Sequence, residues 1–407
     1  MQQGMFANGR GRVLLFCWLG WVFDFYDLIL FSFTKGMVAS ELGLDLYSQV
    51  SWIEGWSLLA TAVGGALFGR IADRTGRRAA MVGSIVVFSV GALCTGLADG
   101  FWSLLAARVV TGLGVGGEWG IGHAVVADYW SGKQRDRVHG ILQAGSPIAM
   151  ALAAAVGCFV APLPDVGWRA VFVGSAVLGV LALLGRWAMP GPDRARQAGA
   201  KTETAAAPLP MRALLSPRHR RATSVLLAIL SLHMAGFWCV YAELPVALMR
   251  LHEVPIEVVG WFQIRVNAVH VVADILFGFL AARYGRRRMF VVFCIVFALG
   301  QAIVLGGLDS IREDFTTFTI AVAAMGLGAG TWSCFGALFG ELYPAALRAT
   351  AAALCYAVAR SVQLPLKGQV AGMFESAGSL APALWIGIAC ALGSALLVPL
   401  LPRPRSG

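Results

Sequence analysis

Charged residues are scarce in this sequence. Only 13% of its 407 residues are Asp, Glu, Lys or Arg, whereas 58% are hydrophobic and the mean hydropathy is +0.73. An ordinary soluble domain carries about 25% charged residues. The shortage of charge therefore excludes a typical soluble protein and predicts a protein that crosses a membrane many times.

The chain also lacks the patterns that mark disulfide frameworks, metal sites and several enzyme classes. Its eight cysteines all fall inside apolar runs, and none forms a Cys-x-x-Cys pair. We interpret them as small residues of membrane-spanning segments. There is no Walker lysine loop, no His-Glu-x-x-His and no nucleophile elbow in the sequence. These absences argue against an enzyme, a cofactor and ATP as the energy source.

What is present is a series of long apolar runs. A spanning helix needs roughly 20 predominantly apolar residues, and the sequence predicts twelve such segments. They cover residues 13–34, 51–72, 79–98, 101–127, 138–161, 168–189, 222–248, 256–282, 289–308, 315–341, 346–373 and 380–401. We predict an all-α membrane protein with two six-helix halves, residues 1–189 and 222–407, joined by a polar linker at 190–221.

The distribution of basic residues predicts the orientation. The net charge of +10 could suggest a nucleic-acid partner, but most of the 32 Lys and Arg lie in short loops on one side of the predicted spans. Membrane proteins keep such loops in the cytoplasm. The other side receives few: Lys35, Arg169, Arg250 and Arg312. Both termini and the linker are therefore predicted to be cytoplasmic, and no nucleic acid is expected as a partner.

The two halves repeat each other. The second span ends in Gly-x-x-x-Asp-Arg-x-Gly-Arg-Arg over residues 69–78, and a second copy follows the eighth span at residues 278–287. Gly112-Leu-Gly114 in the fourth span matches Gly326-Leu-Gly328 in the tenth. The second loop departs from the first at Ala282, which stands where the first has Asp73. Repeated halves of this kind predict a transporter with its site between the halves.

With these motifs the chain resembles the major facilitator superfamily over nearly its whole length. The loop at residues 69–78 is the most specific sign, and residues 341–350 after the tenth span also fit. An acid-and-arginine cluster of this kind can lock the halves in one state and release them in another. The expected lock residues are Gly69, Asp73, Arg74, Gly76, Arg77, Arg78, Asp128, Arg137, Glu341 and Arg348. The outer arginines could instead serve only as positive-inside anchors.

Within the superfamily, three features resemble the proton symporters of organic acids, which include the sialate, aromatic-acid and metabolite branches. The features are the pair Asp24 and Asp27 in the first span, Gly-Gly-Glu-Trp-Gly at residues 116–120, and Arg-Ala-Thr at 348–350 with Cys-Tyr at 355–356. The resemblance implies uptake of a small organic anion, driven by a proton gradient.

Charges inside predicted spans are the candidates for coupling, because each costs about 2.5–3.5 kcal/mol at a helix centre on insertion scales. Asp24 and Asp27 share one helix face, and two close carboxylates cannot easily both ionise, so one could carry a proton. Arg108 stands where the resembled family keeps an arginine associated with proton coupling. Arg108 and Glu118 lie on one face of the fourth span. A static ion pair of Arg108 with Asp24 or Glu118 is the alternative.

Two segments are candidates for binding the substrate. In the eleventh span Arg360, Gln363 and Lys367 form one stripe, and an arginine fork suits a carboxylate. In the eighth span, Gln263, Asn267, His270 and Asp274 form a stripe opposite Arg265, and only one of these faces can look into the cavity. His270 with Asp274 is a candidate proton relay, and Arg265 is the alternative anion ligand. Pocket-shaping candidates are Tyr26, Gln143 and Trp332.

These observations predict a monomeric, proton-coupled symporter for a small carboxylate in the inner membrane of a bacterium, working by alternating access. Asp24, Asp27, Arg108 and Glu118 would couple the proton. A proton-coupled drug or metabolite exporter, a carrier of a carboxylate-rich metal chelate and a transporter-like sensor are the alternatives.

Overall fold

The computed structural model describes residues 9–187, 209–241, 244–251, 253–308, 314–361 and 378–402, and these contain helices and no strand. The first half consists of α1 (Arg10–Leu42), α2 (Ser51–Thr75), α3 (Arg77–Gly96), α4 (Phe101–Tyr129), α5 (Gly132–Gln143), α6 (Gly145–Ala155) and α7 (Gly167–Trp187). A π-helical turn precedes α2 at Leu46–Val50, and another prolongs α6 at Val156–Val160.

The second half follows the predicted linker, which contains a short 3₁₀ helix at Met211–Leu215. This half consists of α9 (Arg220–Tyr241), α10 (Leu244–Leu251), α11 (Ile256–Tyr284), α12 (Arg286–Gly306), α13 (Phe315–Gly328), α14 (Trp332–Leu342), α15 (Ala345–Ser361) and α17 (Ala381–Leu397). A 3₁₀ turn at Ala329–Thr331 joins α13 to α14, and a last one, Val398–Leu400, follows α17.

Nine helical segments within the described ranges are long and apolar enough to cross a membrane. Each coincides with one of the predicted spans. The other predicted spans correspond to α4, α7 and α15, and the latter two adjoin residues outside the described ranges. The all-α membrane fold predicted from the apolar runs is thus confirmed.

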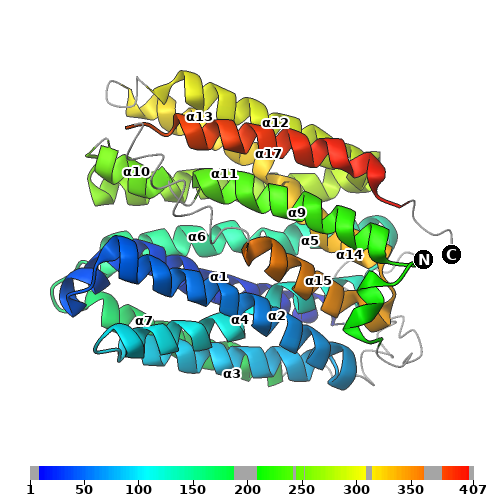
Figure 1. Cartoon of the computed structure of the whole chain (residues 1–407), viewed down its shortest axis with the longest axis horizontal. Coiled ribbons are helices and arrows are strands. Elements are labelled where there is room, and N and C mark those ends of the chain that lie inside the picture. The colour runs from blue at the N-terminus through cyan, green and yellow to red at the C-terminus, as the bar shows by residue number, and fades with distance from the viewer. Residues whose placement is uncertain are drawn as a thin grey trace.

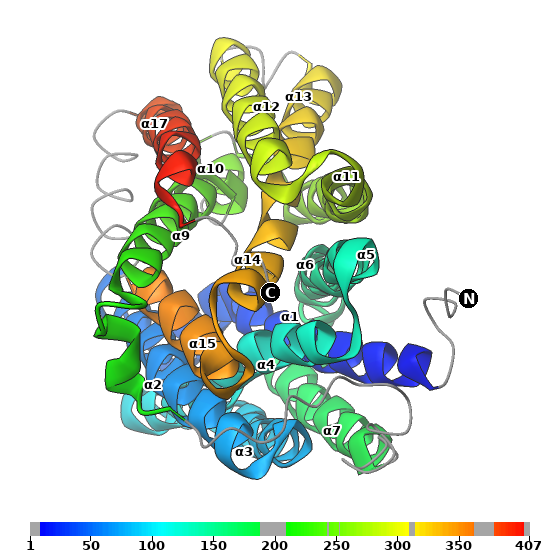
Figure 2. The same cartoon turned by 90° about the vertical axis from the view of Figure 1, so that its right-hand side faces the viewer.

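The helices of each half pack together, and the two halves lie side by side along the bundle (Figure 1). Figure 2 views the molecule along the helices. In this view α5, α6, α14 and α15 lie in the middle, where the first half meets the second. Contacts across the halves join α2 to α15, α5 and α6 to α11, and α4 to α14 and α15. We call the end of the bundle at which α1 begins and α17 finishes the terminal end.

The internal repeat shapes the loops at the terminal end. Gly76 separates α2 from α3 with a φ of 104°, and Gly285 separates α11 from α12 with a φ of 95°. Side chains strain the backbone at such positive φ values, which glycine adopts freely. The same turn therefore follows the same helix in each half, and it places Arg77 and Arg286 at the start of equivalent helices.

Candidate functional site

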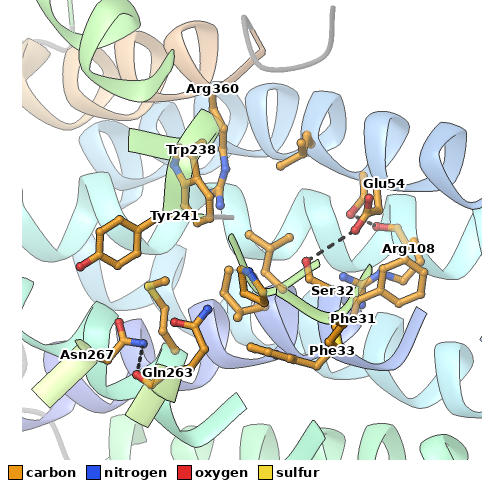
Figure 3. Close-up of a pocket in the computed structure, with 17 residues that line it drawn as sticks. Phe31, Ser32, Phe33, Glu54, Arg108, Trp238, Tyr241, Gln263, Asn267 and Arg360 are labelled. Carbon is orange, nitrogen blue, oxygen red and sulfur yellow. Dashed lines mark hydrogen bonds between the residues drawn. The ribbon is translucent and has the colours of Figure 1, made fainter. Parts of the chain in front are cut away.

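A cavity lies between the halves, in the part of the bundle away from the terminal end. It holds about 830 Å³ of empty space, including the part open to solvent. Side chains from α1, α2, α4 and α6 line it on one side, and those from α9, α10, α11 and α15 on the other. Figure 3 shows its two polar regions: Ser32, Glu54 and Arg108 from the first half, and Trp238, Tyr241, Gln263, Asn267 and Arg360 from the second.

The first half contributes a fully buried ion pair. Arg108 Nη1 lies 2.8 Å from Asp27 Oδ2, and both side chains are buried. The guanidinium also lies 4.7 Å from the centre of the Phe31 ring and 5.7 Å from that of Phe172. Asp27 is not a lining residue, whereas Arg108 is. A change in the charge of Asp27 would therefore alter the electrostatic potential of the cavity through its partner Arg108.

The other two predicted coupling acids lie elsewhere. Asp24 is completely buried in α1 and is not among the lining residues. Glu118 accepts a hydrogen bond from Ser84 of α3, inside the first half, so it faces away from the cavity. The structure thus brings Arg108 together with Asp27, and not with Asp24 or Glu118 as the static alternative supposed.

A second buried guanidinium belongs to α15. Arg360 lines the cavity, and its Cζ lies 5.7 Å from the ring centre of Phe25, 6.0 Å from Trp238 and 5.7 Å from Tyr356. Among the described residues it forms no ion pair with a carboxylate. Cation–π contacts stabilise a buried arginine but leave its forked donors available to an anion. Gln363 and Lys367, predicted on the same stripe, lie outside the described residues.

In the eighth predicted span, which is α11, the polar stripe faces inward. Gln263 and Asn267 line the cavity, and His270 and Asp274 continue the same face deeper into the bundle. Arg265 is exposed on the opposite face and does not line the cavity, so the geometry favours the polar stripe over Arg265 as the face that meets a substrate. His270 is buried but is not a lining residue. Its Nε2 lies 3.6 Å from Asp274 Oδ2.

The predicted pocket-shaping residues lie outside the cavity lining. Tyr26 is directed toward Ser175 of α7. Trp332 packs edge-on against His233 and Phe237 in the aromatic core of the second half. Tyr26 and Trp332, predicted to shape the pocket, therefore do not line this cavity. Their aromatic bodies fill the interior of the halves instead, which is the commoner use of such residues.

Gln143 belongs to a buried polar group that also contains two histidines the sequence reasoning missed. Its Oε1 accepts from Trp119 Nε1 at 3.0 Å, and its Nε2 donates to Ser146 at 3.0 Å. His123 Nε2, 3.2 Å from the same oxygen, must then donate to it. In the neutral pair His139 Nδ1 consequently donates to His123 Nδ1, 2.8 Å away.

Neither histidine could be found from spacing alone, because they lie in different spans with no motif between them. Glu54 was missed as well. It lines the cavity, pairs with Lys35 at 3.3 Å and accepts from Ser32 at 3.5 Å. The sequence signal for Glu54 was weak. The residue lies near the start of a predicted span, where a charge is usually explained by the membrane interface.

An ion-pair network joins the halves at the terminal end. Arg77 pairs with Asp73 and lies 3.2 Å from Asp128, which also lies 2.8 Å from Arg348 of α15. Asp73 accepts hydrogen bonds from the backbone and hydroxyl of Thr350, at 2.9 and 2.7 Å. We call Asp73, Arg77, Asp128, Arg348 and Thr350 the lock cluster. It contains residues of both halves.

The second loop forms an equivalent network with a different acid. Arg286 lies 3.1 Å from Glu341 of its own half and 3.2 Å from Asp136 of the other. Arg287 pairs with Glu341 at 2.6 Å. Ala282 supplies no carboxylate where the first loop has Asp73, so Asp136 provides the bridge between the halves.

The remaining residues predicted for the lock have other surroundings. Arg74 and Arg78 are exposed, which fits the alternative of positive-inside anchors. Arg137 lies 5.1 Å from the Phe279 ring of α11, across the halves. Gly69 packs against α15, where an added Cβ would lie 3.0 Å from Ala349 O. Gly76 serves the turn described above.

The sequence model of the Major Facilitator Superfamily matches residues 17–264, more than half of the chain. The chain belongs to the major facilitator superfamily. It is therefore a multi-pass membrane transporter and not an enzyme.

This chain aligns with two relatives over most of its own length and most of theirs. It is 29% identical over 363 residues to the 3-(3-hydroxy-phenyl)propionate transporter of Escherichia coli K12, covering 87% of this chain and 85% of the relative. It is 26% identical over 377 residues to the gentisate transporter of Corynebacterium glutamicum, covering 89% and 81%.

Among solved structures, this member of the superfamily is similar to the proton:xylose symporter XylE bound to 6-bromo-6-deoxy-D-glucose. The TM-score is 0.78, with 16% sequence identity and coverage of 96% of each chain. At this identity the likeness establishes a shared fold.

Proposed function

We propose that the protein is a proton-coupled symporter that takes up a small organic acid, most suitably an aromatic carboxylate, by alternating access. The observation that carries the proposal is Arg360, a buried guanidinium in the cavity without a carboxylate partner among the described residues. Two full-length relatives bear the names of transporters for gentisate and a hydroxyphenylpropionate, both of which are aromatic acids.

The surroundings of Arg360 suit an aromatic acid. The guanidinium can bind both oxygens of a carboxylate through parallel hydrogen bonds. Trp238 and Tyr241 provide ring faces and edges within the same cavity, and the amides of Gln263 and Asn267 can donate to or accept from a ring hydroxyl. A cavity with an apolar lining and few convergent polar groups is typical of small-molecule sites.

The Asp27–Arg108 pair supplies the proposed coupling. A proton on Asp27 removes the negative charge that Arg108 faces at 2.8 Å. The cavity then becomes more positive, because Arg108 lines it, and an incoming anion is attracted. When the anion leaves, the pair re-forms as the proton leaves. Asp24 and Glu118, which lie outside the cavity, would assist only through their surroundings.

The ion pairs at the terminal end support alternating access. The lock cluster and the Asp136–Arg286 pair hold the halves together there, while the cavity lies in the opposite part of the bundle. We propose that Gly69, Asp73, Arg77, Asp128, Arg137, Glu341 and Arg348 stabilise this closed state. Breaking these contacts would let the halves separate at the terminal end.

The proposed location is the cytoplasmic membrane of a bacterium, with both termini in the cytoplasm and the protein acting as a monomer. Basic residues gather in the loops at the terminal end, where Arg74, Arg78 and Arg288 lie. The described structure then corresponds to a state closed toward the cytoplasm.

The test is uptake by the full chain in proteoliposomes with an inward proton gradient. The panel contains labelled gentisate, 3-(3-hydroxyphenyl)propionate, a sialic acid, a dicarboxylate, a lipophilic dye and an iron chelate, each with and without a protonophore. Accumulation of an acid that the protonophore abolishes supports the proposal. If no acid accumulates and a dye or drug moves against the gradient, the exporter alternative replaces it; accumulation only of an iron chelate would favour the chelate carrier.

A further inference from the structure

A buried histidine–carboxylate pair lies in the second half and takes no part in the coupling described above. His270 Nε2 lies 3.6 Å from Asp274 Oδ2 on successive turns of α11. Both side chains are buried, at 1% and 0% exposure. The other carboxylate oxygen, Oδ1, accepts a hydrogen bond from Ser333 of α14 at 2.8 Å.

No cation balances this carboxylate in the part of the chain that the structure describes. The groups that face the pair are polar or aromatic: Ser333 from α14, Tyr241 and His233 from α9, and the backbone of Ala329. An ionised carboxylate buried without a cation is costly, and binding a proton removes that cost. This situation differs from that of Asp27, which an arginine compensates.

The pair is connected to the cavity by its own helix face. Gln263 and Asn267 line the cavity, and His270 and Asp274 follow on the same stripe. Asn267 Oδ1 is buried without a hydrogen-bond partner. Both His270 nitrogens and Asp274 Oδ2 are likewise buried without a hydrogen-bond partner among the described residues. The stripe therefore offers unused donors and acceptors from the cavity side to Asp274, as a proton shuttle requires.

The other end of the stripe meets the contact between the halves. Gly140 of α5 packs so closely on α11 that an added Cβ would lie 2.6 Å from Asp274 O. The backbone of α11 at Asp274 is therefore covered by α5 while the halves are joined there. Separation of α5 from α11 would uncover this part of α11 on the side of the terminal end.

We propose that His270 and Asp274 form a second proton-binding site, so that two protons cross with each substrate anion. This inference rests on the proposed function and adds the proton number to it. One proton with a monoanion is electrically neutral, whereas two protons carry one net positive charge per cycle. The proton reaches Asp274 along the α11 stripe and leaves when the α5–α11 contact opens.

The test is the voltage dependence of uptake, with labelled 3-(3-hydroxyphenyl)propionate as the monoanionic probe. Full-length protein is reconstituted without a pH gradient, and a potassium diffusion potential, negative inside, is applied with valinomycin. We expect about tenfold accumulation for each 59 mV in the wild type. Asp274→Asn, which keeps the shape, should lose the response to potential while its uptake still follows an imposed pH gradient. Asp165→Asn, an exposed carboxylate, should behave as the wild type.

Two results would overturn the inference and leave the proposed function standing. The first is wild-type uptake that follows the pH gradient but ignores the potential, which needs no variant and no assumption about folding. The second is an Asp274→Asn variant that responds to potential as the wild type does. Absence of any acid accumulation on a proton gradient would instead remove the proposed function itself, and this inference with it.

Discussion

At the scale of single residues, the two buried arginines of the cavity have different partners. Arg108 pairs with Asp27, whereas Arg360 lies against aromatic rings and forms no ion pair with a carboxylate among the described residues. An arginine with a fixed carboxylate can respond to a proton, and one without can take up an anion. This difference underlies the separate roles proposed above, coupling for Arg108 and anion binding for Arg360, and it predicts a distinct effect of mutation for each.

We expect Arg360→Ala to raise the KM for the transported acid about 10- to 100-fold, because a charge-assisted hydrogen bond contributes about 1.5–3 kcal/mol. Arg360→Lys should be intermediate, since a lysine retains the charge but not the fork. Concentration-dependent uptake in proteoliposomes measures this. Arg265→Ala, which removes an exposed arginine from α11, is the matched control. An unchanged KM in Arg360→Ala would refute an anion-binding role.

For Asp27→Asn we expect accumulation on a proton gradient to fall well below that of the wild type, because the proton of Asp27 no longer contributes, with exchange of labelled for unlabelled acid across the membrane retained. In exchange, the carrier moves one acid molecule in and another out, and this cycle needs no release of a proton. Net uptake requires the carrier to release its proton inside before it returns empty. Asn keeps an oxygen near Arg108 but cannot carry the charge. The two assays on the same proteoliposomes distinguish uncoupling from misfolding. Normal accumulation by this variant would exclude Asp27 as the coupling residue.

Sequence reasoning singled out Asp27 and Arg108 but not the ion pair that they form. Asp27 and Arg108 were both predicted because a charge in an apolar run is conspicuous. Arg265 was ambiguous because lipid and protein interior are equally apolar, so periodicity defines the faces of α11 without telling which is inside. His123 and His139 carried no local signal, since their contact arises only when α4 and α5 pack.

At the scale of helices, spans were more predictable than their ends. Apolar length located each of the nine candidate spans in the described part of the chain, but the helix α5 begins at Gly132 where the span was predicted from residue 138. The first turns are polar and still helical, because helix formation continues beyond the apolar layer. Helix α1 likewise extends to Leu42, past the predicted end at residue 34. Hydropathy measures the membrane layer and not the helix.

Close helix packing depends on glycines whose neighbours are backbone atoms. At Gly116 of α4 an added Cβ would lie 2.0 Å from Thr61 O and 2.6 Å from Gly65 N of α2. We expect Gly116→Ala to separate α4 from α2 and to cost about 1–3 kcal/mol, as overpacking does. The measurement is the apparent unfolding temperature in detergent. Gly174→Ala on α7, with nothing within 4 Å, is the control and should match the wild type.

At the scale of the whole molecule, the repeat gives two networks of similar design and unequal composition. Arg77 with Asp128 and Arg286 with Glu341 occupy equivalent positions in the halves. The bridges between the halves differ: Arg348 and Thr350 meet the first network, and Asp136 meets the second. Ala282 indicated from the sequence that the second loop lacks the acid of the first. That Asp136 takes its place as the bridge could be identified only from the packing of α5 against the second half.

Asp128 bonds two arginines from different halves, so its removal should weaken the closed terminal end. We expect Asp128→Asn to lower the preference for this state by about 1 kcal/mol, roughly five-fold in population. Spin labels on cysteines introduced at the exposed Lys133 of α5 and Tyr284 of α11, with the exposed Cys94 replaced by Ser, would report the separation of the halves.

The population with the longer distance between the two labels should grow in Asp128→Asn. It should stay unchanged in Arg74→Ala, which alters the charge of the same loop outside the lock cluster. Equal distance distributions in all three proteins would show that the lock cluster does not set the conformational equilibrium.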